Sequence, residues 1–149
     1  SGCIAISIAK RTGAAVTASD VSTDALALAK ENAELNEVSV TFIESDLFRQ
    51  IEGKFDLITC NPPYLSSADM DQLQTEVTFE PKLALFGGED GLDFYRRIAK
   101  EYRKYLNEGG TLLLEIGRTQ VESAANLFSS KTSVQNDLAG NPRLLIVEP

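Results

Sequence analysis

The sequence predicts an α/β fold with a mainly parallel sheet, and two observations support this prediction. Strand-like segments alternate with helical segments along most of the 149 residues, as in parallel sheets covered by helices. Polar residues also stand at the ends of several strand-like segments, namely Asp20, Asp46, Asn61 and residues 115–117. Because open parallel sheets bind ligands beyond the carboxyl ends of their strands, these residues are candidates for a binding site.

The first part of the chain is predicted to form a helix over 3–11, a strand over 14–20, a helix over 22–36 and a strand over 38–46. Ile4 and Ile8 recur at helical spacing in the first helix. In the second helix, Ser22 can cap the first turn, and Leu28 and Leu35 are expected on one face. Both strand-like segments end in an acid.

The second part begins with an apolar segment, 54–60, which is predicted to be a buried strand. A long polar stretch, 61–90, follows, and connections of this length inside a domain are usually functional or mobile. The remaining predictions are a helix over 91–110 stopped by Gly109-Gly110, a buried strand over 111–117, a helix over 118–130 and strands near 132–136 and 143–148. Since only a loop separates the last two strands, one of them is expected to be antiparallel.

Composition predicts a single domain, residues 1–149, in a cytoplasmic protein. No apolar run is long enough to span a bilayer, and no secretory signal is present, so no membrane association is expected. The formal charge of −8, with 14 basic against 22 acidic residues, disfavours direct binding to duplex nucleic acid. The densest basic cluster is interpreted as a solvated helix face, with nucleic-acid contact as the minority alternative; it comprises Arg96, Arg97, Lys100, Arg103 and Lys104.

The residue types also exclude some chemistry. The chain has no histidine, so it contains no histidine metal ligand, catalytic triad or proton shuttle. Cys3 and Cys60 are too few for a disulfide framework and fit no metal-ligand spacing. Both cysteines are expected to be reduced, buried and inert, and no metal site is predicted.

Asp20 and Asp46 are candidate nucleoside ligands. An acid at the end of a strand in such a fold can accept two hydrogen bonds from a ribose diol, which is the role expected for Asp20. The alternative is that Asp20 caps the following helix, although Ser22 is the better cap. Asp46 could accept a hydrogen bond from an adenine amino group while Leu47 and Phe48 cover the ring, or it could only cap a turn. A single glycine before the first helix, Gly2, is weak evidence for a phosphate- or cofactor-binding turn.

The sequence Asn61-Pro62-Pro63-Tyr64 is a stronger signal. Two prolines could simply end a strand and turn the chain. The Asn61 carboxamide and the Pro62 carbonyl nevertheless provide two acceptors on a stiff backbone, which can bind both hydrogens of an NH₂ group. Tyr64 can then stack on a planar group attached to that nitrogen. The motif therefore suits an amide or an exocyclic amine as substrate.

NPPY after an apolar strand resembles the motif of Rossmann-like S-adenosylmethionine methyltransferases that modify planar NH₂ nitrogens. Three groups share it: adenine-N6 DNA methyltransferases, guanine-N2 RNA methyltransferases and HemK/PrmC-type enzymes, which methylate a glutamine amide in peptide chain release factors. The sequence resembles the third group across nearly its whole length. The segments that carry the resemblance are ASDVSTDALALAKENAE, ESDLF, NPPYLSS, FEPKLALFGGEDGLDFYRRI and GGTLLLEIG.

This resemblance implies a class I methyltransferase fold and a function in translation termination, with S-adenosylmethionine as the methyl donor. It places the donor over Ser1-Gly2, its ribose on Asp20 and its adenine beside Asp46-Leu47. Asn61 would hold the acceptor amide and also border the donor. Pro62, Pro63 and Tyr64 would complete the catalytic motif.

The sequence departs from the HemK/PrmC pattern in three respects. Only the final Ser1-Gly2 of the expected glycine-rich loop is present. The resemblance therefore implies that the first strand is missing and that the domain is truncated at its N-terminus, without the helical domain that contacts the release factor. Leu47 also stands where some relatives carry Trp.

Two other functions remain open. An amino-methyltransferase acting on adenine-N6 or guanine-N2 of nucleic acid would share the NPPY motif, although the negative charge disfavours it. A non-catalytic binding module would keep the fold without transferring a methyl group.

Overall fold

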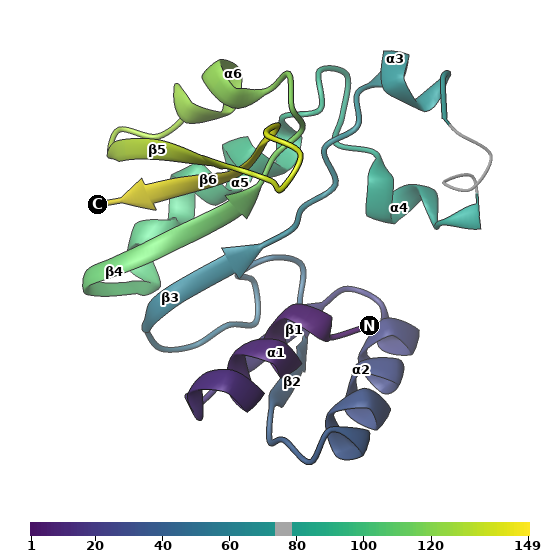
Figure 1. Ribbon diagram of the computed structural model, residues 1–149, viewed down its shortest axis with the longest axis vertical. Coiled ribbons are helices and arrows are strands. Elements are labelled where there is room, and N and C mark those ends of the chain that lie inside the picture. The colour runs from purple at the N-terminus through teal and green to yellow at the C-terminus, as the bar shows by residue number, and fades with distance from the viewer. Residues whose placement is uncertain (74–78) are drawn as a thin grey trace. The chain divides into compact units, whose positions relative to one another are not determined.

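The computed structural model describes residues 1–73 and 79–149 (Figure 1). These residues form two compact units, Ser1–Glu52 and Gly53–Pro149. Part of the predicted polar stretch 61–90, residues 74–78, lies outside the described residues.

The first unit contains two helices and a pair of parallel strands. Its elements are α1 (Cys3–Thr12), β1 (Thr17–Asp20), α2 (Thr23–Leu35) and β2 (Thr41–Glu44). The register runs from Thr17 opposite Thr41 to Asp20 opposite Glu44. Both strands begin later than predicted, because only these four residue pairs form the ladder.

The two helices confirm the predicted helical segments, but the face of α2 that carries Leu28 and Leu35 is not the buried one. Ser22 caps α2 as expected, since its hydroxyl oxygen accepts a hydrogen bond from the Ala25 amide at 3.2 Å. Leu28 and Leu35 are exposed, with 49% and 82% of their surface accessible. The buried face of α2 instead carries Leu26, Ala29 and Ala33. The two small alanine side chains on this face allow the helix to pack closely.

The second unit contains a four-stranded sheet with helices. Its elements are β3 (Phe55–Cys60), α3 (Ser67–Met70), α4 (Lys82–Leu85), α5 (Asp93–Glu101), the 3₁₀ turn η2 (Tyr102–Lys104), β4 (Leu106–Glu115), α6 (Val121–Ala125), β5 (Lys131–Asn136) and β6 (Pro142–Glu148). In the view of Figure 1, α5 lies behind the sheet. The helix predicted over 118–130 is shorter than expected.

The strand order in the second unit is β3-β4-β6-β5. β3 and β4 are parallel, whereas β6 is antiparallel to both of its neighbours. The α/β fold with parallel strand pairs and an antiparallel strand near the end of the chain is therefore confirmed.

The helix predicted over 91–110 is wrong from Leu106 onward. The chain enters β4 at Leu106, which pairs with Phe55, so Gly109 and Gly110 lie inside a strand instead of ending a helix. A Cβ on Gly110 would stand 3.1 Å from the Phe55 carbonyl oxygen, and the register between β3 and β4 shifts at this point. The glycines therefore permit a close approach between two strands.

The core of the second unit lies between α5, η2 and the central strands. Its largest fully buried side chains are Tyr95, Ile98, Tyr102, Leu112, Leu114, Ile116, Leu145 and Val147. The Tyr102 and Phe128 rings pack edge to face at 5.5 Å. The strand predicted over 54–60 is present but is not fully buried, since Leu57 is 43% exposed. Within the described residues β3 pairs only with β4, and it is therefore an edge strand of this sheet.

The basic cluster on α5 and η2 is confirmed as a largely solvated face. Arg96 pairs with Asp90 and Asp93, and the Arg97 guanidinium lies 5.4 Å from the centre of the Phe94 ring. Arg103 donates hydrogen bonds to Ser130 and to the hydroxyl of Tyr102. Neighbouring acids, hydroxyls and rings thus occupy these three arginines.

Candidate functional site

The first group of candidate residues lies at the carboxyl ends of β1 and β2. Asp20 is the exposed last residue of β1, and its Oδ1 accepts a hydrogen bond from the Ser22 amide at 2.9 Å. This bond turns the chain, while Ser22 itself caps α2. Among the described residues no partner contacts Asp20 Oδ2, which leaves an acceptor directed to a ligand or to solvent.

The turn after β2 is organised by Ser45, a residue that the sequence pattern did not single out. Ser45 is 5% exposed; its hydroxyl donates a hydrogen bond to the Leu47 carbonyl at 2.9 Å and accepts one from the Gln50 amide at 2.9 Å. Leu47 adopts a positive φ of 53°. This conformation costs a non-glycine residue about 1–3 kcal/mol and is typical of functional turns. The turn fixes the backbone of Asp46 and Leu47, and a serine directly after a strand was the available sequence signal.

Residue 2 must be glycine because of its backbone conformation and its close contact with α2. It has a φ of 73° at the start of α1, where its carbonyl accepts the first helical hydrogen bond from Ile6 at 2.9 Å. A Cβ at this position would stand 2.8 Å from the Ala29 Cβ. The adjacent Ser1 carbonyl accepts a hydrogen bond from Asn32 at 3.0 Å. Only glycine allows α1 to begin this close to α2.

The second group of candidate residues is the NPPY motif at the carboxyl end of β3. Asn61 is exposed, and Pro62 is buried. Among residues 1–73 and 79–149, neither the Asn61 side chain nor the Pro62 carbonyl takes part in an intramolecular hydrogen bond. Two polar groups next to a rigid diproline are thus available to a ligand.

Residues after the motif hold it against the loop of residues 87–91, with the sequence GGEDG, which is the glycine-rich loop of the second unit. Leu65 forms a bridge with Phe86: its amide donates to the Leu85 carbonyl at 2.9 Å, and its carbonyl accepts from the Gly87 amide at 2.8 Å. A Cβ on Gly87 would stand 2.7 Å from the Pro63 carbonyl oxygen and 2.8 Å from the Tyr64 Cα. The GGEDG segment therefore supports NPPY through backbone contacts, which gives a physical reason for its presence.

The hydroxyl of Tyr64 lies between two charged side chains. It donates a hydrogen bond to Glu115 Oε1 at 3.3 Å and accepts one from Arg143 Nη1 at 3.3 Å. Burial, and then the negative charge of Glu115, raise the pKa of Tyr64 above its usual value. Stacking of the Tyr64 ring on a substrate stays a prediction, but the hydroxyl is already held by the protein.

Glu115 is also fixed through its backbone. The hydroxyl of Tyr95 donates a hydrogen bond to the Glu115 carbonyl at 2.7 Å. Tyr95 is fully buried, and this burial raises its pKa above the usual range. The end of β4, noted in the sequence as residues 115–117, is thereby tied to the core.

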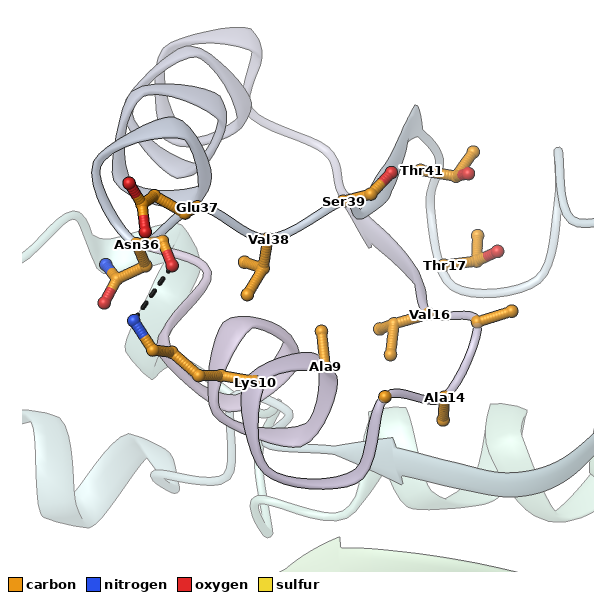
Figure 2. A pocket seen from close by; sticks show the side chains of 12 residues that line it. Ala9, Lys10, Ala14, Val16, Thr17, Asn36, Glu37, Val38, Ser39 and Thr41 are labelled. Carbon is orange, nitrogen blue, oxygen red and sulfur yellow. Dashed lines mark hydrogen bonds between the residues drawn. The ribbon is translucent and has the colours of Figure 1, made fainter.

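A hollow of about 680 Å³ lies at the other ends of β1 and β2 (Figure 2). Within it, Lys10 Nζ donates a hydrogen bond to the Asn36 carbonyl at 3.0 Å. Small and apolar side chains form most of the remaining wall; the lining consists of Ala9, Lys10, residues 13–17, residues 36–39 and Thr41. Because this hollow is at the amino ends of the strands, away from Asp20 and Asp46, we do not assign the candidate site to it.

The cysteine prediction is partly wrong. Cys3 is exposed, because it faces outward at the start of α1, whereas Cys60 is half-buried. Burial raises the pKa of the Cys60 thiol to about 12, so it stays protonated at neutral pH.

The part of the chain that the structure describes contains no cluster of three metal-ligating side chains and no helix long and apolar enough to cross a bilayer.

The predicted residues thus fall into two groups according to the unit that contains them. Ser1, Gly2, Asp20, Asp46 and Leu47 belong to the first unit, and Asn61–Tyr64 belong to the second. Sequence reasoning missed Ser45 and Arg143, because their contacts depend on turn geometry or on strand order.

Comparison with known proteins identifies a family. Residues 1–82 match the model of the methyltransferase small domain. The release factor glutamine methyltransferase of Geobacter sulfurreducens is 47% identical over 132 residues, which cover 87% of this chain and 46% of that protein. The ribosomal protein uL3 glutamine methyltransferase of Francisella tularensis is 46% identical over 124 residues, which cover 80% of this chain and 40% of that protein.

The fold also has relatives of known structure. A methyltransferase from Pyrococcus furiosus superposes with a TM-score of 0.72 at 21% identity, covering 97% of this chain and 68% of that chain. The chain spans about half the length of the curated relatives it matches, from 46% to 57% for three of them. Since the methyltransferase small domain match covers more than half of the sequence, the chain belongs to the methyltransferase small domain family.

Proposed function

We propose that the protein transfers a methyl group from S-adenosylmethionine to the side-chain amide nitrogen of glutamine in the Gly-Gly-Gln motif of peptide chain release factors. The observation that carries this proposal is the free pair of acceptors at NPPY, the Asn61 side chain and the Pro62 carbonyl. Relatives that are named release factor glutamine methyltransferases support the substrate class.

The first unit supplies the residues that would hold the methyl donor. Asp20 Oδ2 is available to accept hydrogen bonds from a ribose diol, and the turn fixed by Ser45 presents Asp46 and Leu47 to the adenine. At Gly2, close packing leaves no room for a Cβ. A glycine turn of this kind suits the methionine part of the donor. These residues fit the donor, which supplies an electrophilic methyl group when it is bound.

The second unit supplies the residues that would hold the methyl acceptor. An amide nitrogen is a weak nucleophile because its lone pair is delocalised into the carbonyl. When the Asn61 side chain and the Pro62 carbonyl accept hydrogen bonds from both N–H groups of the amide, they favour the electron-rich, pyramidal nitrogen of the transition state. Holding the two reactants in line provides the other contribution to the rate. As the bond between the nitrogen and the methyl carbon forms, the bond from that carbon to the sulfonium sulfur of the donor would break, and the nitrogen would release one of its two hydrogens to water as a proton.

Several further properties belong to this proposal. Residues 1–149 act as one methyltransferase domain in the cytoplasm, without membrane association. The release factor is the partner, and duplex nucleic acid does not bind directly, in agreement with the formal charge of −8.

A second substrate has a specific observation in its favour. The relative named ribosomal protein uL3 glutamine methyltransferase is 46% identical, against 47% for a release factor enzyme. Both names specify glutamine, and NPPY would hold either glutamine side chain in the same way. The motif therefore supports amide methylation more strongly than it supports one protein substrate.

The test is a competition among acceptors. Full-length protein carrying this sequence is mixed with isotopically labelled S-adenosylmethionine and with a release factor, ribosomal protein uL3, ribosomal RNA and duplex DNA. We expect label in the release factor, and fragmentation mass spectrometry should place the methyl group on the glutamine of Gly-Gly-Gln. Label in uL3 alone would select the second substrate, and label only in nucleic acid would reject amide methylation.

Calorimetry distinguishes an enzyme from a binding module that has lost its cofactor site. Full-length protein should bind S-adenosylmethionine, and Asp20→Ala should weaken the binding. A protein that binds no S-adenosylmethionine and labels no acceptor would be such a module.

A further inference from the structure

The carbonyl of Tyr64 is held by the side chain of Gln120, which lies 56 residues further along the chain. Gln120 Nε2 donates to the Tyr64 carbonyl at 2.9 Å and to the Gly91 carbonyl at 3.4 Å. Gln120 Oε1 accepts from the Gly117 amide at 3.2 Å. One carboxamide thus joins the NPPY motif, the glycine-rich loop and the end of β4.

The space around Gln120 is closely filled. A Cβ on Gly117 would stand 2.7 Å from Gln120 Oε1, and a Cβ on Gly91 would stand 2.5 Å from Gln120 Nε2. Gly91 has a φ of 74°, a conformation that glycine adopts without strain. Both glycines therefore make room for the carboxamide.

The phenol end of Tyr64 is held separately. Glu115 Oε1 accepts from the hydroxyl, and Arg143 Nη1 donates to it, each at 3.3 Å. Arg143 Nη1 also lies 3.7 Å from Glu115 Oε1, and Arg143 Nη2 lies 3.8 Å from Asp137 Oδ2. Asp137 in turn accepts hydrogen bonds from the Ala139 and Asn141 amides of the β5–β6 turn, so Arg143 links this turn to Tyr64.

We propose that Gln120, Glu115 and Arg143 are positioning residues, which hold the backbone and ring of Tyr64 and thereby fix the acceptor groups of Asn61 and Pro62. This proposal rests on the proposed function of NPPY. None of the three residues is required to touch the substrate or the methyl donor. Their effect is geometric, and a displacement of about 1 Å at reacting groups can lower a rate about 100-fold.

The chemistry of each contact predicts how it can be broken. Gln120 needs its NH₂ group, because two carbonyls accept from it. Gln120→Glu preserves the size but replaces two donors with an acceptor, so it repels both carbonyls. Glu115 needs only an acceptor oxygen. Glu115→Gln therefore keeps the bond to Tyr64, whereas Glu115→Leu removes it.

The kinetic experiment uses full-length protein carrying this sequence, with a release factor as acceptor. We expect Gln120→Glu to lower kcat at least about tenfold, with less than about threefold change in KM or in the dissociation constant of S-adenosylmethionine. Gln135→Glu, the same substitution at an exposed position in β5, is the matched control and should leave kcat unchanged.

A double-mutant cycle tests whether Glu115 acts through Tyr64. Glu115→Leu should lower kcat, whereas Glu115→Gln should retain more than half of the wild-type kcat. In a Tyr64→Phe background, Glu115→Leu should cost nothing further, because the hydroxyl that it holds is already absent. An equal cost in both backgrounds, or an unchanged kcat for Gln120→Glu, would overturn the proposal.

Amide hydrogen exchange separates this proposal from the proposed function, because it requires no substrate. Gln120→Glu should speed exchange at the Leu65 and Gly87 amides, which form the bridge after NPPY, and leave Leu113, which pairs with Thr59 of β3 and Ile146 of β6, protected. This pattern in a protein that labels no acceptor would preserve the positioning contacts while rejecting the function. Unchanged exchange at Leu65 and Gly87 would overturn the positioning contacts whatever the substrate.

Discussion

The backbone amide of Ser45 donates a hydrogen bond to the carbonyl of Asp20 at 3.0 Å, which sets the carboxyl ends of β1 and β2 side by side. This bond continues the parallel register in which Asp20 lies opposite Glu44. Asp20, the last residue of β1, and Asp46, two residues after the end of β2, consequently lie at the same edge of this strand pair. Two acids in this arrangement can serve two parts of one nucleoside.

Asp20→Ala should weaken the binding of S-adenosylmethionine about 10- to 100-fold, because a hydrogen bond to a charged group contributes about 1.5–3 kcal/mol. Isothermal calorimetry on full-length protein provides the measurement. Glu37→Ala is the control, since Glu37 lies beside the hollow at the opposite ends of the same strands. A dissociation constant for Asp20→Ala within twofold of wild type would remove Asp20 from the donor site.

Gly87→Ala should lower both stability and activity. The added Cβ would meet the Pro63 carbonyl oxygen at 2.7 Å and the Tyr64 Cα at 2.8 Å, so the NPPY backbone must shift. Overpacking of this kind costs about 1–3 kcal/mol. Thermal unfolding and the rate of methyl transfer are measured together.

Gly53→Ala is the matched control for Gly87→Ala. Gly53 has a φ of 87°, and no atom lies within 4 Å of the point that a Cβ would occupy, so this variant carries only backbone strain of about 1–2 kcal/mol. Both variants should lose comparable stability, but only Gly87→Ala should lose activity. Equal activity in the two variants would show that contact with the glycine-rich loop does not position NPPY.

Cys60 should make the free energy of unfolding fall as pH rises above about 9. Burial raises its pKa from 9.0 to about 12, so the folded state keeps the thiol proton after the unfolded state has lost it. The stabilisation is fully present below the unfolded pKa and is lost as pH rises through the folded value. One proton gives a slope of at most about 1.4 kcal/mol per pH unit.

The useful window for this measurement is pH 9 to 10, because the unfolded tyrosines titrate only near 10.0. Denaturant unfolding under reducing conditions gives the slope. Cys60→Ala should flatten the slope, and Cys3→Ala, which replaces an exposed thiol, should keep it. A Cys60→Ala slope equal to wild type would mean that the Cys60 thiol is not protected from solvent.

Much of the fold and part of the site could be predicted from the sequence, because the signals are local. Strand-end acids such as Asp20, the Ser22 cap and the rigid diproline each depend on neighbours within a few residues. The antiparallel strand near the end of the chain followed from the short connection before it. The structure confirms Asp20 at the end of β1, the Ser22 cap of α2 and the antiparallel β6, whereas the binding roles of the candidate residues stay predictions.

Features that depend on tertiary contacts could not be predicted. Helical spacing places Leu28 and Leu35 on one face, but packing against small residues buries the other face of α2. Gly109 is typical of a helix stop, yet pairing of the surrounding segment with β3 draws it into a strand. Gln120 lies 56 residues from the carbonyl that it holds, and no local pattern reveals this contact.

The central claim, that Asn61 holds the acceptor amide, is tested most directly by Asn61→Ala in full-length protein, with kcat and the dissociation constant of S-adenosylmethionine measured on the same preparation. The control is Asn126→Ala, at an exposed position after α6. Removing a hydrogen bond that stabilises the transition state should lower kcat about 10²- to 10³-fold, while donor affinity changes only a few-fold. An Asn61→Ala variant that retains more than half of the wild-type turnover on a release factor would contradict the claim.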